Sequence, residues 1–311
     1  MRKTASSLSR VEVQKIGKVL VGGAVGELPT VLIGTIFYRE HKIVKDHVRG
    51  VFDRAVAEKL IMQQDELSDA TGIPCMVDVV GETPEALQKY IEFVSSITDS
   101  PILLNGPTAD VRLKAFEYIV EIGIQDRIIY TSINYTVKED ETLKLKELGV
   151  RNILIQAFNP RNPWPRGSLE MVVGDGSRKG LLQYAHDAGA TNILILAPVL
   201  DVPYIGVAAT TLEILREKTS LPVGLAPCGV VAKWCVDTNQ RGLREILTAG
   251  VLGYVQAMGA NFIIYGSIRK APKVFPVCAL IDSMIAYSRR REGIRPLVKS
   301  HPIYKFLIRA R

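Results

Sequence analysis

Cysteine, histidine and long apolar runs are all scarce in this chain of 311 residues. The four cysteines, Cys75, Cys228, Cys235 and Cys278, lie far apart without CxxC spacing, which argues against a disulfide framework and favours a reducing cytoplasm. No uninterrupted apolar run approaches the roughly 18 residues that a membrane helix needs, so direct membrane insertion is not expected. The basic N-terminus has no apolar segment behind it and does not resemble a secretory signal.

Motifs for metal binding and for nucleophilic catalysis are also missing. No histidine stands in HxxxH spacing or at ligand spacing from a carboxylate, no serine lies in a GxSxG turn, and no cysteine has a nucleophile motif. The Gly-rich loop 174–180 has the composition of an anion cradle, but a flexible loop before a helix is the favoured interpretation. The sequence therefore predicts no metal site.

Positive charge is in modest excess, with 39 Lys and Arg against 32 Asp and Glu and a formal net charge of +7. This excess weakly favours an acidic partner or an anionic ligand. Much of it lies in residues 289–311, and the value is too small to predict nucleic-acid binding. The proportions of hydrophobic residues (47%) and charged residues (23%) are those of an ordinary globular protein.

One pattern recurs eight times along the chain: a short apolar run, then polar or Gly residues, then an amphipathic segment at helical spacing. The runs are nearly continuous in apolar residues, which is typical of parallel strands buried on both faces. They are Thr30–Phe37, Pro74–Val80, Pro101–Asn105, Arg127–Tyr130, Asn152–Ala157, Asn192–Leu196, Pro222–Ala226 and Asn261–Tyr265.

Eight β-then-α units in sequence favour a closed (β/α)8 barrel over the alternative, a doubly wound open sheet. We expect a single TIM-barrel domain over residues 1–311, with the barrel itself in residues 30–290. Residues 11–23 are predicted to form a hairpin that closes the bottom of the barrel. The basic residues 291–311 are expected to form a C-terminal extension that packs on the outside of the barrel or on a partner.

A barrel of this kind places its active site at the carboxyl ends of the strands. The side chains there are rich in amides and hydroxyls and poor in acids and bases, and they suit a flat heterocycle with donors and acceptors along one edge. Asp78 is the strongest candidate because it interrupts an apolar strand, the alternative being a structural carboxylate paired under the loops. The full set of candidates is Asp78, Glu82, Asn105, Ser132, Asn134, Gln156 and Asp201, with Tyr38, Cys228 and Ser267 at the remaining strand ends.

Three stretches, 26–44, 63–87 and 197–206, resemble the family of the H subunit of tetrahydromethanopterin S-methyltransferase. That family is similar to bacterial enzymes that move methyl groups between a corrinoid protein and tetrahydrofolate, as in glycine betaine breakdown. The resemblance covers about residues 13–290. It implies a barrel that binds a pterin at its strand ends.

The resemblance also implies roles for individual residues. Asp78 matches an aspartate that contacts the pterin in related barrels, whereas Asn105 stands where relatives usually have a second aspartate. Ser132 matches a serine at the end of the fourth strand, and Asp201 is the carboxylate nearest to an aspartate position on the sixth strand. The asparagine that reaches pterin N5 in relatives is replaced within residues 224–228.

From this resemblance we expect a cytoplasmic methyltransferase that moves a methyl group from a methylated corrinoid to N5 of tetrahydrofolate, with Asp78, Asn105 and Asp201 as its catalytic residues. A site short of acids is better matched to methylating N5, where positioning is the main demand, than to activating N5 for methyl donation. The chain has no DxHxxG signature of a cobalamin domain, so a partner protein is expected to carry the corrinoid. The alternatives are a subunit specific for tetrahydromethanopterin and a non-catalytic pterin-binding subunit.

A homodimer is also predicted, because the late helices and the tail hold more apolar residues than one barrel needs to cover its outer face. A tail folded back on its own barrel is the alternative. The residues concerned are Val274, Phe275, Val277, Leu280, Met284, Phe306 and Leu307.

Overall fold

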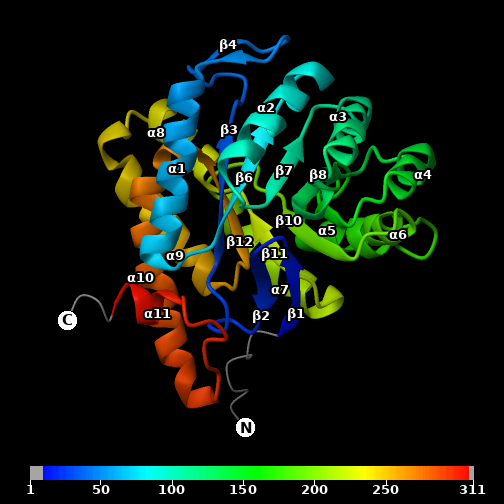
Figure 1. The fold of residues 1–311 in the computed structure, drawn as a ribbon. Coiled ribbons are helices and arrows are strands. Elements are labelled where there is room, and N and C mark those ends of the chain that lie inside the picture. Colours follow the sequence, from blue (N-terminus) through cyan, green and yellow to red (C-terminus); the bar gives the residue numbers. More distant parts are fainter. Residues whose placement is uncertain (1–9, 308–311) are drawn as a thin grey trace.

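Eight parallel strands close into a barrel in the computed structural model, which describes residues 10–307 (Figure 1). The order around the barrel is β10-β11-β12-β3-β6-β7-β8-β9, so the first barrel strand, β3, pairs with the last, β12. All eight predicted strands are present, and barrel closure rules out the doubly wound sheet. The strands are β3 (Val31–Ile36), β6 (Cys75–Val80), β7 (Ile102–Asn105), β8 (Ile128–Ile133), β9 (Asn152–Gln156), β10 (Asn192–Ala197), β11 (Val223–Leu225) and β12 (Phe262–Ser267).

A helix follows each barrel strand and covers its outer face. Capping side chains set several helix starts: Asp53, Thr83 and Thr108 each accept a hydrogen bond from the backbone amide three residues on. Two strands are followed by two helices each, α5 and α6 after β9, and α8 and α9 after β11. The helices are α1 (Arg54–Thr71), α2 (Pro84–Ile97), α3 (Ala109–Glu121), α4 (Glu139–Glu147), α5 (Pro165–Val173), α6 (Leu181–Asp187), α7 (Tyr204–Thr219), α8 (Cys228–Asp237), α9 (Arg244–Ala257), α10 (Ala271–Arg289) and α11 (Pro302–Lys305).

The predicted hairpin is formed by β1 (Val11–Ile16) and β2 (Val19–Gly23), and it lies below the barrel in Figure 1. Its residues Ile16, Val19 and Val21 are buried in one cluster with the inward-facing side chains of the lower barrel. That cluster contains Val31, Ile33, Met76, Leu103, Ile129, Leu154, Leu194 and Phe262. The hairpin therefore closes the amino end of the barrel, as expected. A second, small hairpin, β4 (Val44–Asp46) and β5 (Val51–Phe52), lies between β3 and α1.

The last long helix is tied to the first barrel strand through Asp282 of α10. Its carboxylate accepts hydrogen bonds from the backbone amide of Thr30 (2.7 Å), the Thr30 hydroxyl (2.9 Å) and the Gln256 amide (2.8 Å). Burial raises the pKa of Asp282 to about 6, while these donors pull it down. The two bonds from Thr30 join residues 252 positions apart and so help to close the barrel.

The apolar surplus that predicted a dimer is smaller than the sequence indicated. Val274 and Phe275 are 2% and 0% exposed because they pack against the core of their own barrel. Leu280 and Met284, two of the other residues behind that prediction, remain exposed on α10, and so does Tyr287. These three define the α10 patch.

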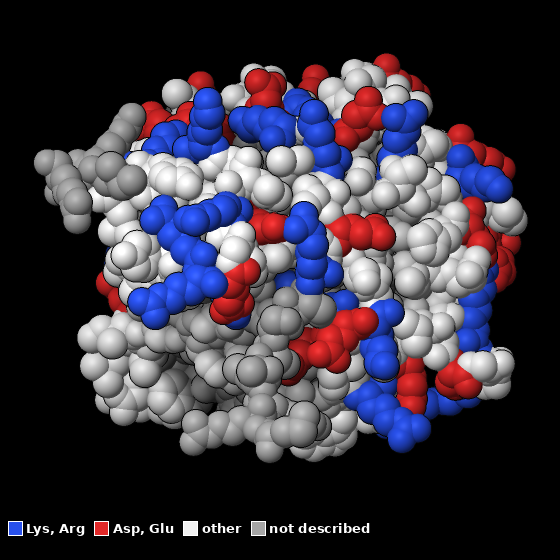
Figure 2. All heavy atoms as spheres, turned by 90° about the horizontal axis from the view of Figure 1, so that it is seen from below, with Lys and Arg blue, Asp and Glu red and all other residues white. Residues whose placement is uncertain are grey.

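The face seen from below carries Lys and Arg interspersed with Asp and Glu over much of its area (Figure 2). Among residues 10–307, no helix is long and apolar enough to cross a membrane.

Candidate functional site

The alternation of side chains along each strand decides which residues line the barrel interior. Met76 of β6 belongs to the lower core, so Asp78, two residues on, also faces inward and lies one layer nearer the carboxyl end. The same step of two residues leads from lower-core residues on β3, β7 and β9 to polar side chains in this upper layer. Those side chains are Thr35, Asn105 and Gln156.

Asp78 is 3% exposed and accepts two hydrogen bonds from neighbouring strands. The Thr35 hydroxyl donates to Oδ2 at 2.9 Å, and the Asn105 side-chain amide donates to Oδ1 at 3.1 Å. Strand register places these groups together, since Thr35 is paired directly with Asp78 in the β3–β6 ladder. Burial raises the pKa of Asp78 to about 6, and the two donors partly oppose that rise.

Both partners of this carboxylate are neutral, so its charge is stabilised by hydrogen bonds alone. An ionised carboxyl offers about four lone-pair sites, and Thr35 and Asn105 occupy two of them. A ligand edge with two N–H groups would fill the remaining sites in a charge-assisted, bidentate manner. Among the described residues, Thr35 and Asn105 are the hydrogen-bond partners of this carboxylate.

Ser132 and Asn134 lie close to each other at the end of β8, two strands from β6. The Asn134 amide donates to the Ser132 hydroxyl at 3.5 Å, and its carbonyl accepts from the Thr136 amide and hydroxyl at 2.9 and 2.7 Å. Gln156 on β9 is partly buried in the inward layer. These predicted residues thus lie along the same barrel rim as Asp78 without hydrogen bonds to it.

Glu82 and Asp201 occupy different surroundings from Asp78. Glu82 is exposed, and its Oε1 lies 3.9 Å from Nε of Arg39. Asp201 is exposed after β10, the strand opposite β6 in the barrel, and its Oδ1 accepts from the backbone amide of Tyr204 at 2.8 Å. The structure therefore brings Asp78 and Asn105 together but leaves Asp201 at the start of α7.

Comparison with known proteins matches residues 9–297 to the family model of the tetrahydromethanopterin S-methyltransferase MtrH subunit. The chain belongs to this family. It is 37% identical to the H subunit of tetrahydromethanopterin S-methyltransferase from Methanothermobacter marburgensis, with 92% of this chain and 94% of that protein covered. It is 33% identical to the corresponding protein of Methanopyrus kandleri (91% and 94% covered) and 37% identical to the H subunit of a putative methyltransferase, mtx, of Methanosarcina mazei (96% and 97% covered).

In this MtrH family member, two residues near the rim were missed in the sequence. Thr35 lies two residues after Ile33 on β3. Because alternate side chains of a strand face the same side, this spacing could have identified Thr35 as an inward-facing residue. His41 is 2% exposed, stacks on Tyr38 with ring centroids 4.6 Å apart, and accepts from the Phe37 amide at Nδ1 (3.1 Å). Its pKa is lowered to about 4, chiefly by burial and further by Arg269 and His47. No local motif marks it.

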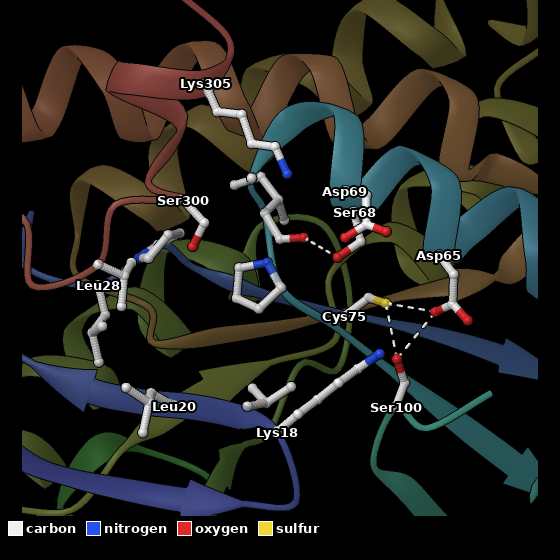
Figure 3. A pocket seen from close by; sticks show the side chains of 16 residues that line it. Lys18, Leu20, Leu28, Asp65, Ser68, Asp69, Cys75, Ser100, Ser300 and Lys305 are labelled. Carbon is white, nitrogen blue, oxygen red and sulfur yellow. Dashed lines mark hydrogen bonds between the residues drawn. The ribbon is translucent and has the colours of Figure 1, made fainter.

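A separate cavity of about 250 Å³ lies at the opposite, amino end of the barrel (Figure 3). Lys18 of the hairpin turn and Lys305 of α11 reach toward it from opposite sides. Inside, the Ser100 hydroxyl donates to Asp65 at 3.1 Å, and the Cys75 thiol lies 3.5 Å from that hydroxyl. Burial raises the pKa of Cys75 to about 12, so the thiol is not a nucleophile at neutral pH. This end of a barrel serves stability more than chemistry.

Within residues 10–307, no three His, Cys, Asp or Glu side chains gather closely enough to hold a metal ion.

Proposed function

We propose that this MtrH family member is a methyltransferase subunit that binds a tetrahydropterin at the carboxyl end of its barrel. The methyl group moves between N5 of that pterin and a corrinoid carried by a partner protein. The observation that carries the proposal is Asp78, a buried carboxylate with only neutral partners, placed at the rim by the alternation of β6.

Asp78 suits the pterin ring because the 2-amino group and N3–H of a pterin form a two-donor edge. Thr35 and Asn105 hold the carboxylate in place, and each keeps hydrogen-bonding capacity for the ring. Ser132, Asn134 and Gln156 continue the polar rim on the next strands. Hydrogen bonds along one edge leave a ring face free for the approach of the methyl group.

The pterin is better assigned as tetrahydromethanopterin than as the tetrahydrofolate expected from the sequence. Two of the relatives described above are named for tetrahydromethanopterin, and one is named a putative methyltransferase. Both pterins present the same ring edge to Asp78, so the rim by itself does not separate them. The comparison with glycine betaine breakdown gains no support from these relatives.

The rim residues contribute positioning more than proton transfer. A corrinoid, when bound to its partner protein, supplies the cobalt that carries the methyl group. Asp78 and Asn105 would fix the ring so that N5 lies within about 3–3.5 Å of that methyl, the separation required for in-line attack. Asp201 is proposed to act from the opposite side of the rim, after β10.

Two partners belong to this proposal. The first is the corrinoid protein, which would dock over the rim as part of a methyltransferase complex. The second is another copy of this chain, with the α10 patch of Leu280, Met284 and Tyr287 as the contact.

Replacing Asp78 tests the proposal directly. Asp78→Ala should weaken tetrahydromethanopterin binding by about 1.5–3 kcal/mol, measured by calorimetry, because a charge-assisted bidentate contact is lost. Asp69→Ala, at an exposed position on α1, is the matched control and should bind normally. Unchanged affinity in Asp78→Ala with a native circular dichroism spectrum would remove the assignment. Binding by the wild type without Co(I) formation from methylcobalamin would favour the non-catalytic alternative.

A further inference from the structure

A cavity of about 240 Å³ opens between the first turns of α9 and α10. We name it the α9/α10 groove. Four of its lining residues are cationic, and one, Glu245, is acidic and paired with Lys273. The floor is apolar, formed by Leu252, Val274 and Val277. The three remaining cations are Arg244, Arg269 and Lys270.

Lys270 is the most unusual of these cations because it is partly buried without a carboxylate. Among the residues that the structure describes, none forms an ion pair with Lys270, Arg244 or Arg269. The Lys270 ammonium lies 3.6 Å from where a Cβ on Gly266 would stand, so it points back along the end of β12. Burial lowers the pKa of Lys270, and Arg244 adds to that fall while the Cys228 thiol opposes it. A half-buried ammonium of this kind gains free energy from an anionic ligand.

The backbone adds to the positive potential of the groove. Both α9 and α10 begin at it, and neither has a side chain that caps its first amides. Helix N-termini carry partial positive charge, which favours oxyanions. The first amide of each helix is already used, since Arg244 N–H donates to Arg241 O and Ala271 N–H to Ile268 O, so the helix ends contribute their dipoles more than free donors. Cations and helix ends thus point to the same class of ligand.

The groove lies on the same side of the barrel as Asp78. It follows β11 and β12, and Ser267 at the end of β12 is paired with Thr35, which is itself paired with Asp78. Two strand spacings of about 4.8 Å therefore separate the end of β12 from Asp78. An extended ligand, held by its ring at Asp78, would reach Lys270.

We infer that the α9/α10 groove binds the oxyanion groups, carboxylate or phosphate, on the tail of the tetrahydropterin. The inference rests on the proposed function and deepens it. Tetrahydropterin tails end in such groups, glutamyl carboxylates in tetrahydrofolate and a phosphate with carboxylates in tetrahydromethanopterin. Arg244, Arg269 and Lys270 supply the charge, while Asp78 holds the ring.

The test separates tail from ring by measuring two ligands, tetrahydromethanopterin and the tail-less 6-methyltetrahydropterin, by calorimetry. Lys270→Gln and the exposed Arg269→Gln should each weaken tetrahydromethanopterin binding about tenfold, as expected when one charge-assisted contact is lost. The affinity for 6-methyltetrahydropterin should not change. Inorganic phosphate should compete with the tailed ligand alone. Lys59→Gln, an exposed lysine on α1, is the control and should bind both ligands normally.

Several outcomes would overturn the inference. If either variant has an equally reduced affinity for both ligands, the substitution has disturbed the fold, and the groove does not bind the tail. If Asp78→Ala loses both ligands while Lys270→Gln and Arg269→Gln lose neither, the proposed function stands and the tail binds elsewhere. If the wild type binds neither pterin, the proposed function fails and this assignment fails with it.

Discussion

Asp78→Asn should stabilise the protein at neutral pH. The native carboxylate is buried beside two neutral donors, so ionising it on folding costs free energy. Asparagine has nearly the same shape and carries no charge. The Thr35 hydroxyl can rotate and the Asn105 amide can turn, so both can still bond to an amide at position 78.

The pKa of Asp78 sets the size of this effect. It rises from 3.8 to about 6 on folding, a shift that corresponds to about 3 kcal/mol of lost stability at pH 7. Because the folded carboxyl has the higher pKa, the native state is favoured when the group is protonated. Stability from this group is therefore fully present below about pH 4 and is lost as the pH rises through 6. Weaker hydrogen bonds in the amide offset part of the gain, so we expect about 1–3 kcal/mol at pH 7.

Urea unfolding followed by circular dichroism, at pH 7 and at pH 4, measures the difference in unfolding free energy between Asp78→Asn and the wild type and how it depends on pH. The variant should have the larger free energy of unfolding at pH 7, and the difference from the wild type should largely disappear at pH 4. Asp69→Asn, at an exposed position, should leave stability unchanged at both values. A variant that is less stable than the wild type at pH 7, or a difference independent of pH, would refute the reasoning.

Other predictions concern packing and assembly. Phe262→Ala should cost about 3–5 kcal/mol in urea unfolding, because Phe262 is fully buried in the cluster that the hairpin closes; a cost below about 1 kcal/mol would contradict that core. Gly72→Ala should destabilise by more than Gly149→Ala in the same assay. Both glycines have positive φ (78° and 66°), but only at Gly72 would a Cβ collide with a backbone oxygen, that of Ser300, at 1.9 Å. If the α10 patch joins two subunits, light scattering should give a dimeric mass for the wild type and a monomeric mass for Met284→Asp, whose side chain is 54% exposed; a monomeric wild type would exclude the dimer.

Much of the barrel was predictable because its signals are local. Continuous apolar runs marked all eight strands, because each strand is buried on both faces. The boundaries of α1 are local as well, since Asp53 caps its start and Gly72 ends it. The repeat predicted one helix after each strand, so α5 and α8, the additional helices after β9 and β11, were not expected.

The candidate site was predictable only in part. The position of Asp78 followed from its interruption of an apolar strand at a barrel rim, and this needed no structure. Its partners did not follow, because Thr35 and Asn105 reach it through ladder register between strands that are far apart in sequence. For Asp201 the sequence suggested a role in the site. In the structure its carboxylate accepts a hydrogen bond from the backbone amide of Tyr204.

The sequence by itself determined the eight barrel strands, the N-terminal hairpin and the family, because periodicity and long similar stretches are properties of neighbouring residues. Tertiary structure decided which side chains meet. Closure pairs β3 with β12, and that single contact brings Thr35, Ser267 and the 3-10 turn that ends at Lys270 to one side of the rim. Burial also comes only from the fold, and burial is what raises the pKa of Asp78 and leaves Lys270 half-buried without a carboxylate.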